Sequence, residues 1–183
     1  MTDVVIVGGG PAGLSAALFT EKNGLDTAVY DTDETWMHKA HLFNYLGIDS
    51  MDGTEFVETS RAQVEAFGVD IYESEVTGVE QGDDGFVVST ADGESEATYL
   101  VLATGADRSL AEALDCKFDG DLVDVNLSME TSVEDAYATG AMVRDQEWQA
   151  IISAGDGGAA ALDILSKEEG EHFHDFDVPA DAE

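Results

Sequence analysis

The hydrophobic pattern begins with an apolar run at residues 4–7, followed by a glycine-rich turn, an alanine-rich segment and a second predicted strand at residues 26–30, whose last three residues are Ala, Val and Tyr. A short, continuous apolar run is typical of a strand that is buried on both faces of a parallel sheet. The segment between these two strands predicts a helix, with Gly24 in the usual position after a helix end. The N-terminus therefore predicts a strand–helix–strand unit, with Asp31 at the end of its second strand.

Helical and extended patterns alternate along the rest of the chain. They predict, in order, a loop at residues 32–53, a helix at 54–67, strands at 69–80, 86–90 and 97–103, a short helix at 108–114, brief strands at 122–125 and 135–138, and a helix at 148–167. Turn sequences separate the three longer strands, so we expect a small antiparallel meander. The order of elements predicts an α/β fold in a single domain at residues 1–167. Residues 168–183 form an acidic tail that we expect to be disordered.

Composition adds an unusual charge balance. The chain has 183 residues, 44% of them hydrophobic, with 40 Asp and Glu against 7 Lys and Arg and a formal net charge of −33. This charge repels nucleic acid and anionic membranes, so we exclude both as direct partners. Concentrated salt screens such charges within about 3 Å at 1 M, and we interpret the chain as a halophile's protein. No signal peptide or apolar span is apparent, so we expect a cytoplasmic location.

The glycines after the first strand follow the G-x-G-x-x-G pattern of dinucleotide-binding proteins. Gly8 permits the tight turn, Gly10 lets a pyrophosphate approach the backbone, and Gly13 lets the helix pack closely on the strand. The pyrophosphate is expected on the free N–H groups at the helix N-terminus. Asp31 stands where an acid accepts hydrogen bonds from an adenosine ribose. These residues predict a dinucleotide-binding site, the alternative being a glycine-rich turn without a ligand.

The tetrapeptide Ala-Thr-Gly-Ala occurs twice, at residues 103–106 and 138–141, each time at the end of a predicted strand. Ligands of α/β sheets bind at the carboxyl ends of the strands. We therefore expect Thr104, Gly105 and Gly140 to meet the same ligand.

Together these motifs resemble the FAD domain of thioredoxin reductase and related two-dinucleotide-domain flavoproteins. The similarity covers most of the chain and includes residues 44–47, 53–68, 129–133, 137–140 and 149–150, besides the glycine turn and the first Ala-Thr-Gly-Ala. The resemblance implies a three-layer, Rossmann-like fold for binding FAD or NAD(P), with a parallel sheet and an antiparallel β-meander. It also implies that the cofactor is held by Gly8, Gly10, Pro11, Ala12, Gly13, Asp31, Asn44, Val76, Thr104, Gly105, Gly140, Gln149 and Ala150.

The chain departs from that family in what is missing. The family inserts an NADPH domain, with a second glycine motif and a C-x-x-C pair, after the Ala-Thr-Gly strand, and here only residues 107–121 stand in its place. Cys116 is the only cysteine, so we exclude a dithiol–disulfide relay. We also exclude hydride delivery from a dedicated NADPH domain.

Three further departures lie in the expected flavin site. Ala141 replaces the family's ribityl-binding acid, Trp148 replaces an arginine, and Thr-Trp-Met-His at residues 35–38 replaces a Gly-Gly-Gln stretch. Loss of the acid removes a hydrogen bond worth about 1.5–3 kcal/mol, equivalent to about one to two powers of ten in FAD affinity. FAD is the first choice of cofactor, with NAD or an adenine nucleotide as the alternative. Trp148 either stacks on the flavin or packs on the core.

The remaining candidates each have a functional and a structural interpretation. Cys116 is either a redox thiol or a structural cysteine, and no adjacent base or second thiol supports its activation. His38 and His41 lie either near the flavin ring or in a loop with ordinary hydrogen-bond partners. His172 and His174 make a poor metal site, because a third ligand is missing. We therefore predict no metal site and name no catalytic residue.

Two classes of function remain. The first is an FAD-binding oxidoreductase of reduced size, with electrons from a protein partner, a small molecule or transiently bound NAD(P)H. The second is a non-enzymatic module that binds FAD or NAD, or a subunit of a larger complex. The missing domain is expected to leave an apolar face uncovered around residues 107–120, which predicts a homo-oligomer or another partner there.

Overall fold

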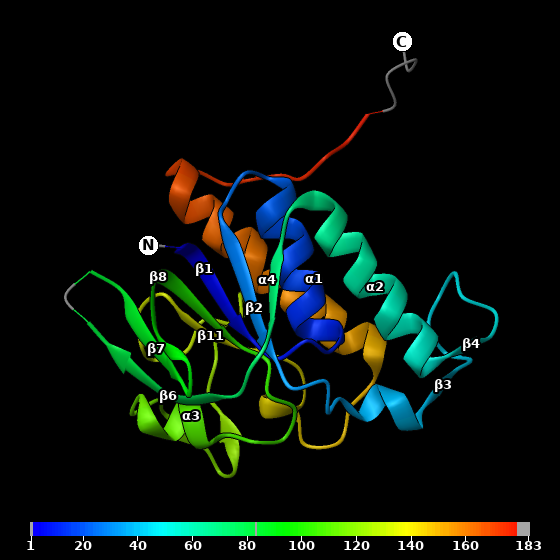
Figure 1. Cartoon of the computed structure of the whole chain (residues 1–183), viewed down its shortest axis with the longest axis horizontal. Coiled ribbons are helices and arrows are strands. Elements are labelled where there is room, and N and C mark those ends of the chain that lie inside the picture. The colour runs from blue at the N-terminus through cyan, green and yellow to red at the C-terminus, as the bar shows by residue number, and fades with distance from the viewer. Residues whose placement is uncertain (1, 83, 179–183) are drawn as a thin grey trace.

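Parallel strands form the centre of the computed structural model, which describes residues 2–82 and 84–178 (Figure 1). They are β1 (Thr2–Val7), β2 (Thr27–Asp31), β5 (Asp70–Glu73), β8 (Gly93–Leu102) and β11 (Ala136–Ala138), in the order β5-β2-β1-β8-β11. β1 pairs with β2 on one side and with β8 on the other, so its residues Val4, Val5 and Ile6 are completely buried. The predicted α/β fold with a parallel sheet is confirmed.

The antiparallel meander consists of β6 (Val76–Gln81), β7 (Phe86–Thr90) and the first half of β8. The prediction of one strand at residues 69–80 was wrong, because this segment contains both β5 and β6. The N–H of Ser74 donates to the carbonyl of Tyr72 (2.9 Å), and this tight turn redirects the chain from the parallel sheet into the meander. Because apolar and polar residues continue to alternate across the turn, the sequence pattern does not reveal where β5 ends and β6 begins.

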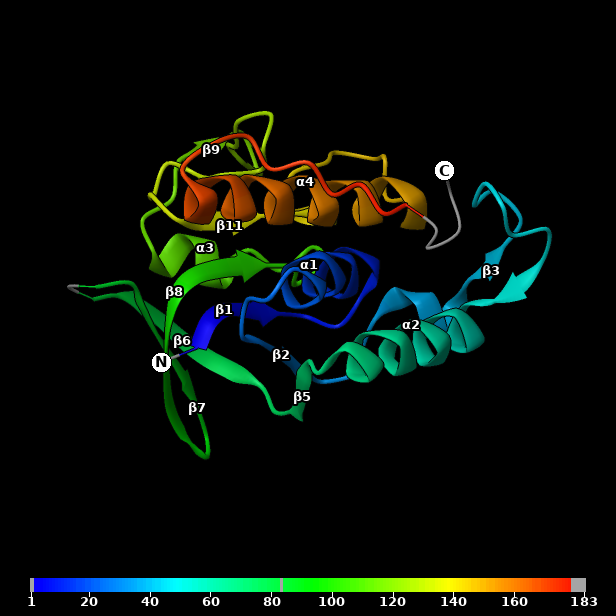
Figure 2. The ribbon, with the colours of Figure 1, turned by 90° about the horizontal axis from the view of Figure 1, so that it is seen from above.

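Two layers enclose the parallel sheet. α1 (Pro11–Lys22), α2 (Gly53–Phe67) and α4 (Ala150–Glu169) pack on one face, while the meander and α3 (Ser109–Ala113) pack on the other. Figure 2 shows the β6–β7 hairpin projecting away from the three long helices. Alternate residues of β1 serve the two layers, Val4 and Ile6 on the helical side and Val5 and Val7 on the other. The three-layer arrangement implied by the resemblance is therefore present.

The glycines of α4 allow it to lie directly on α1. A Cβ at Gly157 would stand 2.0 Å from the carbonyl oxygen of Ala12, whereas a Cβ at Gly155 would meet nothing within 4 Å. The close contact made possible by Gly157 is therefore with another helix, next to the glycine turn.

The segment predicted as a loop contains short elements of its own. They are the 3-10 helix η1 (Trp36–Lys39) and the hairpin of β3 (His41–Leu42) and β4 (Met51–Asp52). Met37, Leu42 and Val57 form a small core between this hairpin and α2. A Cβ at Gly53 would lie 1.9 Å from the carbonyl oxygen of Met37, so the start of α2 fixes the position of η1.

The segment that replaces the family's inserted domain folds back on the meander side of the sheet. It contains α3 and the hairpin of β9 (Phe118–Asp119) and β10 (Leu122–Val123). Ala111, Leu114 and Cys116 are all buried in the core on this side. The expected apolar face around residues 107–120 was therefore wrong, because these side chains cover one another and the meander.

The helix before the acidic tail extends to Glu169, two residues beyond its predicted end at residue 167. The following segment, up to residue 178, has no regular structure but contacts the helical layer. Lys22 pairs with Asp175 at 2.7 Å, and the N–H of Phe173 donates to Ser166 (3.1 Å). Residues 168 and 169 are thus helical rather than part of a disordered tail, residues 170–178 have no regular structure, and residues 179–183 lie outside the described part. Among the described helices, none has the length and apolar character needed to cross a membrane.

Candidate nucleotide-binding site

The glycine turn between β1 and α1 has no room for side chains. Gly8 has a φ of +112°, and a Cβ there would lie 2.3 Å from the carbonyl oxygen of Ala103 at the end of β8. A Cβ at Gly13 would lie 1.8 Å from the carbonyl oxygen of Gly8. Glycine is required at both positions because backbone occupies the space that a methyl group needs. The turn is therefore held against β8, at the carboxyl edge of the parallel strands.

The N-terminus of α1 is open for an anion. Gly10 is the N-cap residue and Pro11 the first helical residue, and within the described part of the chain no side chain caps the helix. The N–H groups of Ala12 and Gly13 thus stand at a helix start whose dipole attracts negative charge. Thr35 is the nearest neighbour of Gly10, since its Oγ1 would lie 3.4 Å from a Cβ built there. This arrangement suits a pyrophosphate.

Asp31, the last residue of β2, lies beside the turn with only 6% of its surface exposed. Its Oδ1 accepts a hydrogen bond from the N–H of Gly9 (2.8 Å). A Cβ at Gly9 would lie 2.3 Å from the other carboxylate oxygen, so the acid and the turn touch directly. Each carboxylate oxygen can accept more than one hydrogen bond, which leaves capacity for ribose hydroxyl groups.

Arg61 on α2 holds the second oxygen of this carboxylate. Its Nη1 donates to Asp31 Oδ2 at 2.7 Å and lies 3.4 Å from Asp33. Asp33 in turn contacts His38 Nε2 (3.0 Å), and His38 Nδ1 contacts the hydroxyl of Thr54 (3.1 Å). The sequence analysis predicted neither the contact of Gly9 with Asp31 nor this network of side chains. The available signal was that Arg61 is one of seven basic residues in the chain.

The two Ala-Thr-Gly-Ala segments lie side by side, because β8 and β11 are parallel neighbours with Leu102 opposite Ala138. Gly140 begins the 3-10 helix η2 (Gly140–Met142) with a φ of +65°, and a Cβ there would lie 3.5 Å from Ala12 Cβ. Both segments therefore end next to the start of α1. This placement is consistent with the prediction that both segments contact the same ligand.

Thr104 and Arg108 lie at this strand end and make local contacts. The hydroxyl of Thr104 donates to the carbonyl of Asp107 (2.6 Å), and Gly105 has a φ of +68° with open space around it. The guanidinium of Arg108 donates to the carbonyls of Ala106 (2.9 Å), Ala141 (2.9 Å) and Met142 (3.0 Å). Arg108 thereby ties the two strand ends together.

Asn44 and Gln149 come together although the sequence places them far apart. Asn44 Nδ2 donates to Gln149 Oε1 at 2.6 Å, and both side chains are exposed. Gln149 is the N-cap residue of α4 and Ala150 its first residue. Ala150 packs against the small core under the β3–β4 hairpin. Only the resemblance groups these two residues in the sequence, and in the structure their amides are in contact.

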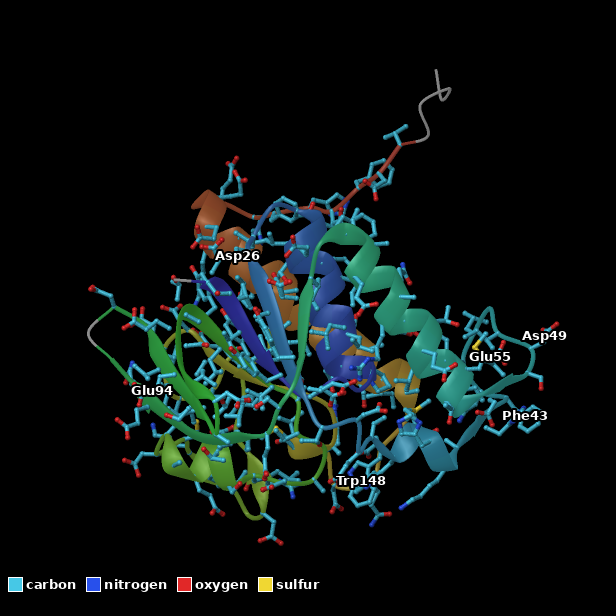
Figure 3. The ribbon with its side chains drawn as sticks, in the orientation of Figure 1. Asp26, Phe43, Asp49, Glu55, Glu94 and Trp148 are labelled. Atoms are coloured by element: carbon cyan, nitrogen blue, oxygen red, sulfur yellow. The ribbon has the colours of Figure 1, made fainter. Side chains whose placement is uncertain are left out.

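A pair of tryptophans lies at the same end of the site. The ring centroids of Trp36 and Trp148 are 5.2 Å apart, with an interplanar angle of 52°. The indole N–H of Trp148 donates to the carbonyl of Arg144 (3.0 Å), and Arg144 pairs with the buried Asp156 of α4. This contact with Asp156 raises the pKa of the Arg144 guanidinium above its usual value. Figure 3 shows Trp148 on the loop that precedes α4.

These contacts divide the site into two parts. We name them after the parts of FAD that the resemblance assigns to them. The adenosine half comprises the turn from Gly8 to Gly13 together with Asp31, and the flavin half comprises Trp36, Asn44, Ala141, Trp148 and Gln149. Ala141 is 8% exposed and adds no polar side chain to the flavin half. The first half thus offers free N–H groups beside a buried carboxylate, whereas the second offers amide and indole groups but no acid at residue 141.

Comparison with known proteins agrees with this geometry. The family model described as pyridine nucleotide-disulphide oxidoreductase matches residues 2–58 and 47–158. The chain belongs to the pyridine nucleotide-disulphide oxidoreductase family. Its members, thioredoxin reductases among them, are FAD-binding flavoproteins, so the expected cofactor agrees with the family.

Curated relatives match only part of their own length. Thioredoxin reductase of Treponema pallidum (strain Nichols) is 37% identical over 115 residues, which cover 57% of this chain and 36% of that protein. Thioredoxin reductase of Listeria monocytogenes is 30% identical over 108 residues, covering 57% and 34%. The chain thus spans about a third of the length of the curated relatives that it matches.

Solved structures of the same kind superpose on nearly the whole chain. The atypical thioredoxin reductase TRi from Desulfovibrio vulgaris Hildenborough gives a TM-score of 0.87 at 19% identity, covering 93% of this chain and 99% of that chain. A thioredoxin reductase from Gloeobacter violaceus gives 0.86 at 21% identity, covering 97% and 98%. At these identities the likeness shows the fold, which is that of the oxidoreductase family.

The other predicted candidates lie outside the candidate nucleotide-binding site or make ordinary contacts with neighbouring residues. Val76 begins β6 with its side chain buried in the core, so only its backbone can face a ligand. Cys116 is buried, its Sγ lies 3.6 Å from Thr131 Oγ1, and burial raises the pKa of its thiol. His41 contacts the hydroxyl of Ser50 (2.9 Å). The described residues contain no group of three metal-ligating side chains, His172 and His174 included.

Proposed function

We propose that this chain is an FAD-binding oxidoreductase domain of reduced size, without a dithiol relay. The observation that carries the proposal is the adenosine half, where Gly8, Gly9 and Gly13 leave no space for side chains and Asp31 adjoins the open start of α1. Nothing in a structural turn requires a bare helix N-terminus next to a buried carboxylate. A bound dinucleotide explains both features.

The residues divide the work of holding the cofactor. The N–H groups at the start of α1 face the pyrophosphate, and Asp31, oriented by Gly9 and Arg61, faces the ribose. Asn44 and Gln149 offer amide donors and acceptors at the flavin half. The flavin supplies reversible transfer of one or two electrons when bound, and the protein supplies binding and access. Electrons would come from a protein partner or from transiently bound NAD(P)H.

A second function is favoured by one observation. Ala141 offers no acid to the ribityl chain, although the adenosine half is intact. A non-enzymatic module that binds FAD, NAD or another adenine nucleotide, alone or within a larger complex, requires only that half. We place it second because the flavin half retains the Asn44–Gln149 contact.

The visible spectrum of the protein purified in molar KCl and mixed with FAD tests both functions. We expect a bound, yellow flavin that NADH, NADPH or a reduced partner protein bleaches under anaerobic conditions. A protein that binds ADP but takes up no FAD would support the nucleotide-binding module instead. A protein that binds neither contradicts both functions.

We also propose that the protein works in concentrated salt. Four of its seven basic residues, Lys22, Arg61, Arg144 and Lys167, are already paired with carboxylates, and most acids point outward. Figure 3 shows Asp26, Glu55 and Glu94 on separate parts of the surface. Repulsion among these charges destabilises the compact state unless salt screens it. We expect the melting temperature to fall steadily as KCl is dialysed away, and a constant melting temperature would contradict this proposal.

We propose a partner surface at a different place from the one that the sequence predicted. Large exposed apolar side chains gather around the flavin half, on η1, the β3–β4 hairpin and the start of α4; they are Trp36, Phe43, Leu46, Trp148 and Ile151. Figure 3 shows Phe43 on the hairpin, at the edge of the molecule. We propose that an electron donor, or a second copy of the chain, approaches here. Light scattering in molar KCl distinguishes a homo-oligomer from a monomer.

A further inference from the structure

Both tryptophans of the chain lie at the flavin half and touch each other. Trp36 comes from η1 and Trp148 from the loop before α4, so the contact joins two segments that are distant in sequence. Their exposed fractions are 51% and 46%. Tryptophans that serve only a core bury most of their rings, so half-exposed indoles at a binding site call for a ligand.

Hydrogen bonds and backbone contacts hold both tryptophans in place. On one side, Thr35 caps η1 by accepting from the N–H of Met37, and the backbone of Met37 lies against Gly53 at the start of α2. On the other side, the N–H of Trp148 is fixed on the carbonyl of Arg144, which the buried Asp156 holds in place. Both indoles are therefore positioned by the fold, although their faces are open to solvent.

The two rings are tilted against each other rather than stacked. Their planes are inclined by 52° at a centroid distance of 5.2 Å, and about half of each indole is exposed, so ring surface on both remains available to a ligand. Thr35 also stands next to Gly10, where the pyrophosphate is expected, and Trp148 directly precedes Gln149 and Ala150. A flat ring attached to that pyrophosphate would reach the tryptophans.

We propose that Trp36 and Trp148 form a stacking site for the isoalloxazine ring of FAD. The inference rests on the proposed function. Aromatic stacking requires no charge, and it can supply attachment where Ala141 offers no acid to the ribityl chain. Stacking thus replaces a hydrogen bond as the main anchor of the flavin half.

Binding of FAD and of ADP, measured by calorimetry in molar KCl, tests the proposal. ADP contains the adenosine and the two phosphates but no flavin, so it reports the adenosine half alone. The variants are Trp36→Leu, Trp148→Leu and Trp148→Phe. Phe67→Leu is the matched control, because Phe67 is 49% exposed at the far end of α2.

We expect each tryptophan-to-leucine change to weaken FAD binding about tenfold and to leave ADP binding unchanged. Trp148→Phe should retain most of the affinity, and Phe67→Leu should match the wild type. FAD should also quench the tryptophan fluorescence of the wild type more than ADP does. Unchanged FAD affinity in both leucine variants, or an equal loss for FAD and ADP, overturns the stacking site.

The results that contradict the proposed function differ from those that contradict only the stacking site. A wild-type protein that binds neither FAD nor ADP removes the proposed function and the stacking site together. A wild-type protein that binds ADP but not FAD removes the stacking site and leaves a nucleotide-binding module. FAD binding that is indifferent to both tryptophans removes the stacking site alone.

Discussion

The adenosine half and the flavin half of the site are built in different ways. In the adenosine half, backbone atoms of Gly8, Gly13 and the end of β8 are so close that glycine is the only residue that fits. In the flavin half, exposed side chains from three separate segments meet through an amide contact and an indole contact. A site made of backbone is determined by the fold itself, whereas a site made of side chains changes with single substitutions. We therefore expect the first half to set the class of ligand and the second half to set what the ligand does.

The largest expected effect tests the steric basis of the adenosine half. Gly13→Ala places a methyl group 1.8 Å from the carbonyl oxygen of Gly8, and we expect it to lower the free energy of unfolding by more than about 3 kcal/mol. Gly155→Ala is the control, since open space surrounds that helical glycine and alanine gains up to about 1 kcal/mol in a helix. Urea denaturation in molar KCl measures both. Equal stabilities would mean that the turn adjusts easily.

A smaller effect is expected from the charge in the adenosine half. Asp31→Asn removes the charge that Gly9 and Arg61 orient toward the ribose. We expect ADP and FAD to bind about tenfold to a hundredfold more weakly, because a hydrogen bond to a charged group is worth about 1.5–3 kcal/mol. Calorimetry with Asp33→Asn as the control should show a minor change. If FAD binding weakens and ADP binding does not, Asp31 serves the flavin half instead.

Restoring an acid to the flavin half should act in the opposite direction. Ala141→Asp is expected to strengthen FAD binding about tenfold and to leave ADP binding unchanged, because only the ribityl chain gains a partner. The protein without FAD should melt at a lower temperature, since the new carboxylate occupies a buried position. Ala106→Asp is the control, as it alters the corresponding residue of the first tetrapeptide. Unchanged FAD affinity would show that the flavin does not reach Ala141.

The smallest effect is expected at Cys116, outside both halves. Burial raises the pKa of its thiol, so the reactive thiolate is scarcer in the folded protein than in the unfolded chain. Iodoacetamide should therefore label the folded protein slowly at pH 8 and the unfolded protein rapidly, and Cys116→Ala should bind FAD normally. Because the folded pKa is raised, the buried thiol stabilises the protein below its ordinary pKa, and this contribution declines at higher pH. Rapid labelling of the folded protein would indicate an accessible thiol.

The two halves also differ in how much of each can be predicted from the sequence. The strand–turn–helix of the adenosine half is predictable because local features, an apolar run, three glycines and an acid, encode it within a short stretch. The buried strand that ends at Leu102 follows from composition in the same way. Arg61 escaped prediction because its partner Asp31 lies on another element, and helical periodicity does not indicate which strand end a side chain will reach.

The flavin half was less predictable for the same reason. Asn44 and Gln149 were grouped by resemblance, and neither pattern nor spacing predicts that their amides meet. The Trp36–Trp148 contact depends on η1, which forms in a segment without hydrophobic period. Likewise, the buried side of residues 107–120 appears only when the chain folds back on the meander.

The contact between α1 and α4 has a consequence for how the molecule is assembled. Gly157, near the end of the chain, packs on the backbone of Ala12, near its beginning, and β1 is completed only when β8 joins it. Long-range contacts of this kind slow folding, because the chain must close large loops before native contacts form. The start of α1 therefore acquires its final surroundings only after Gly157 has left the ribosome. Nucleotide present during refolding should then act late, by trapping the finished fold.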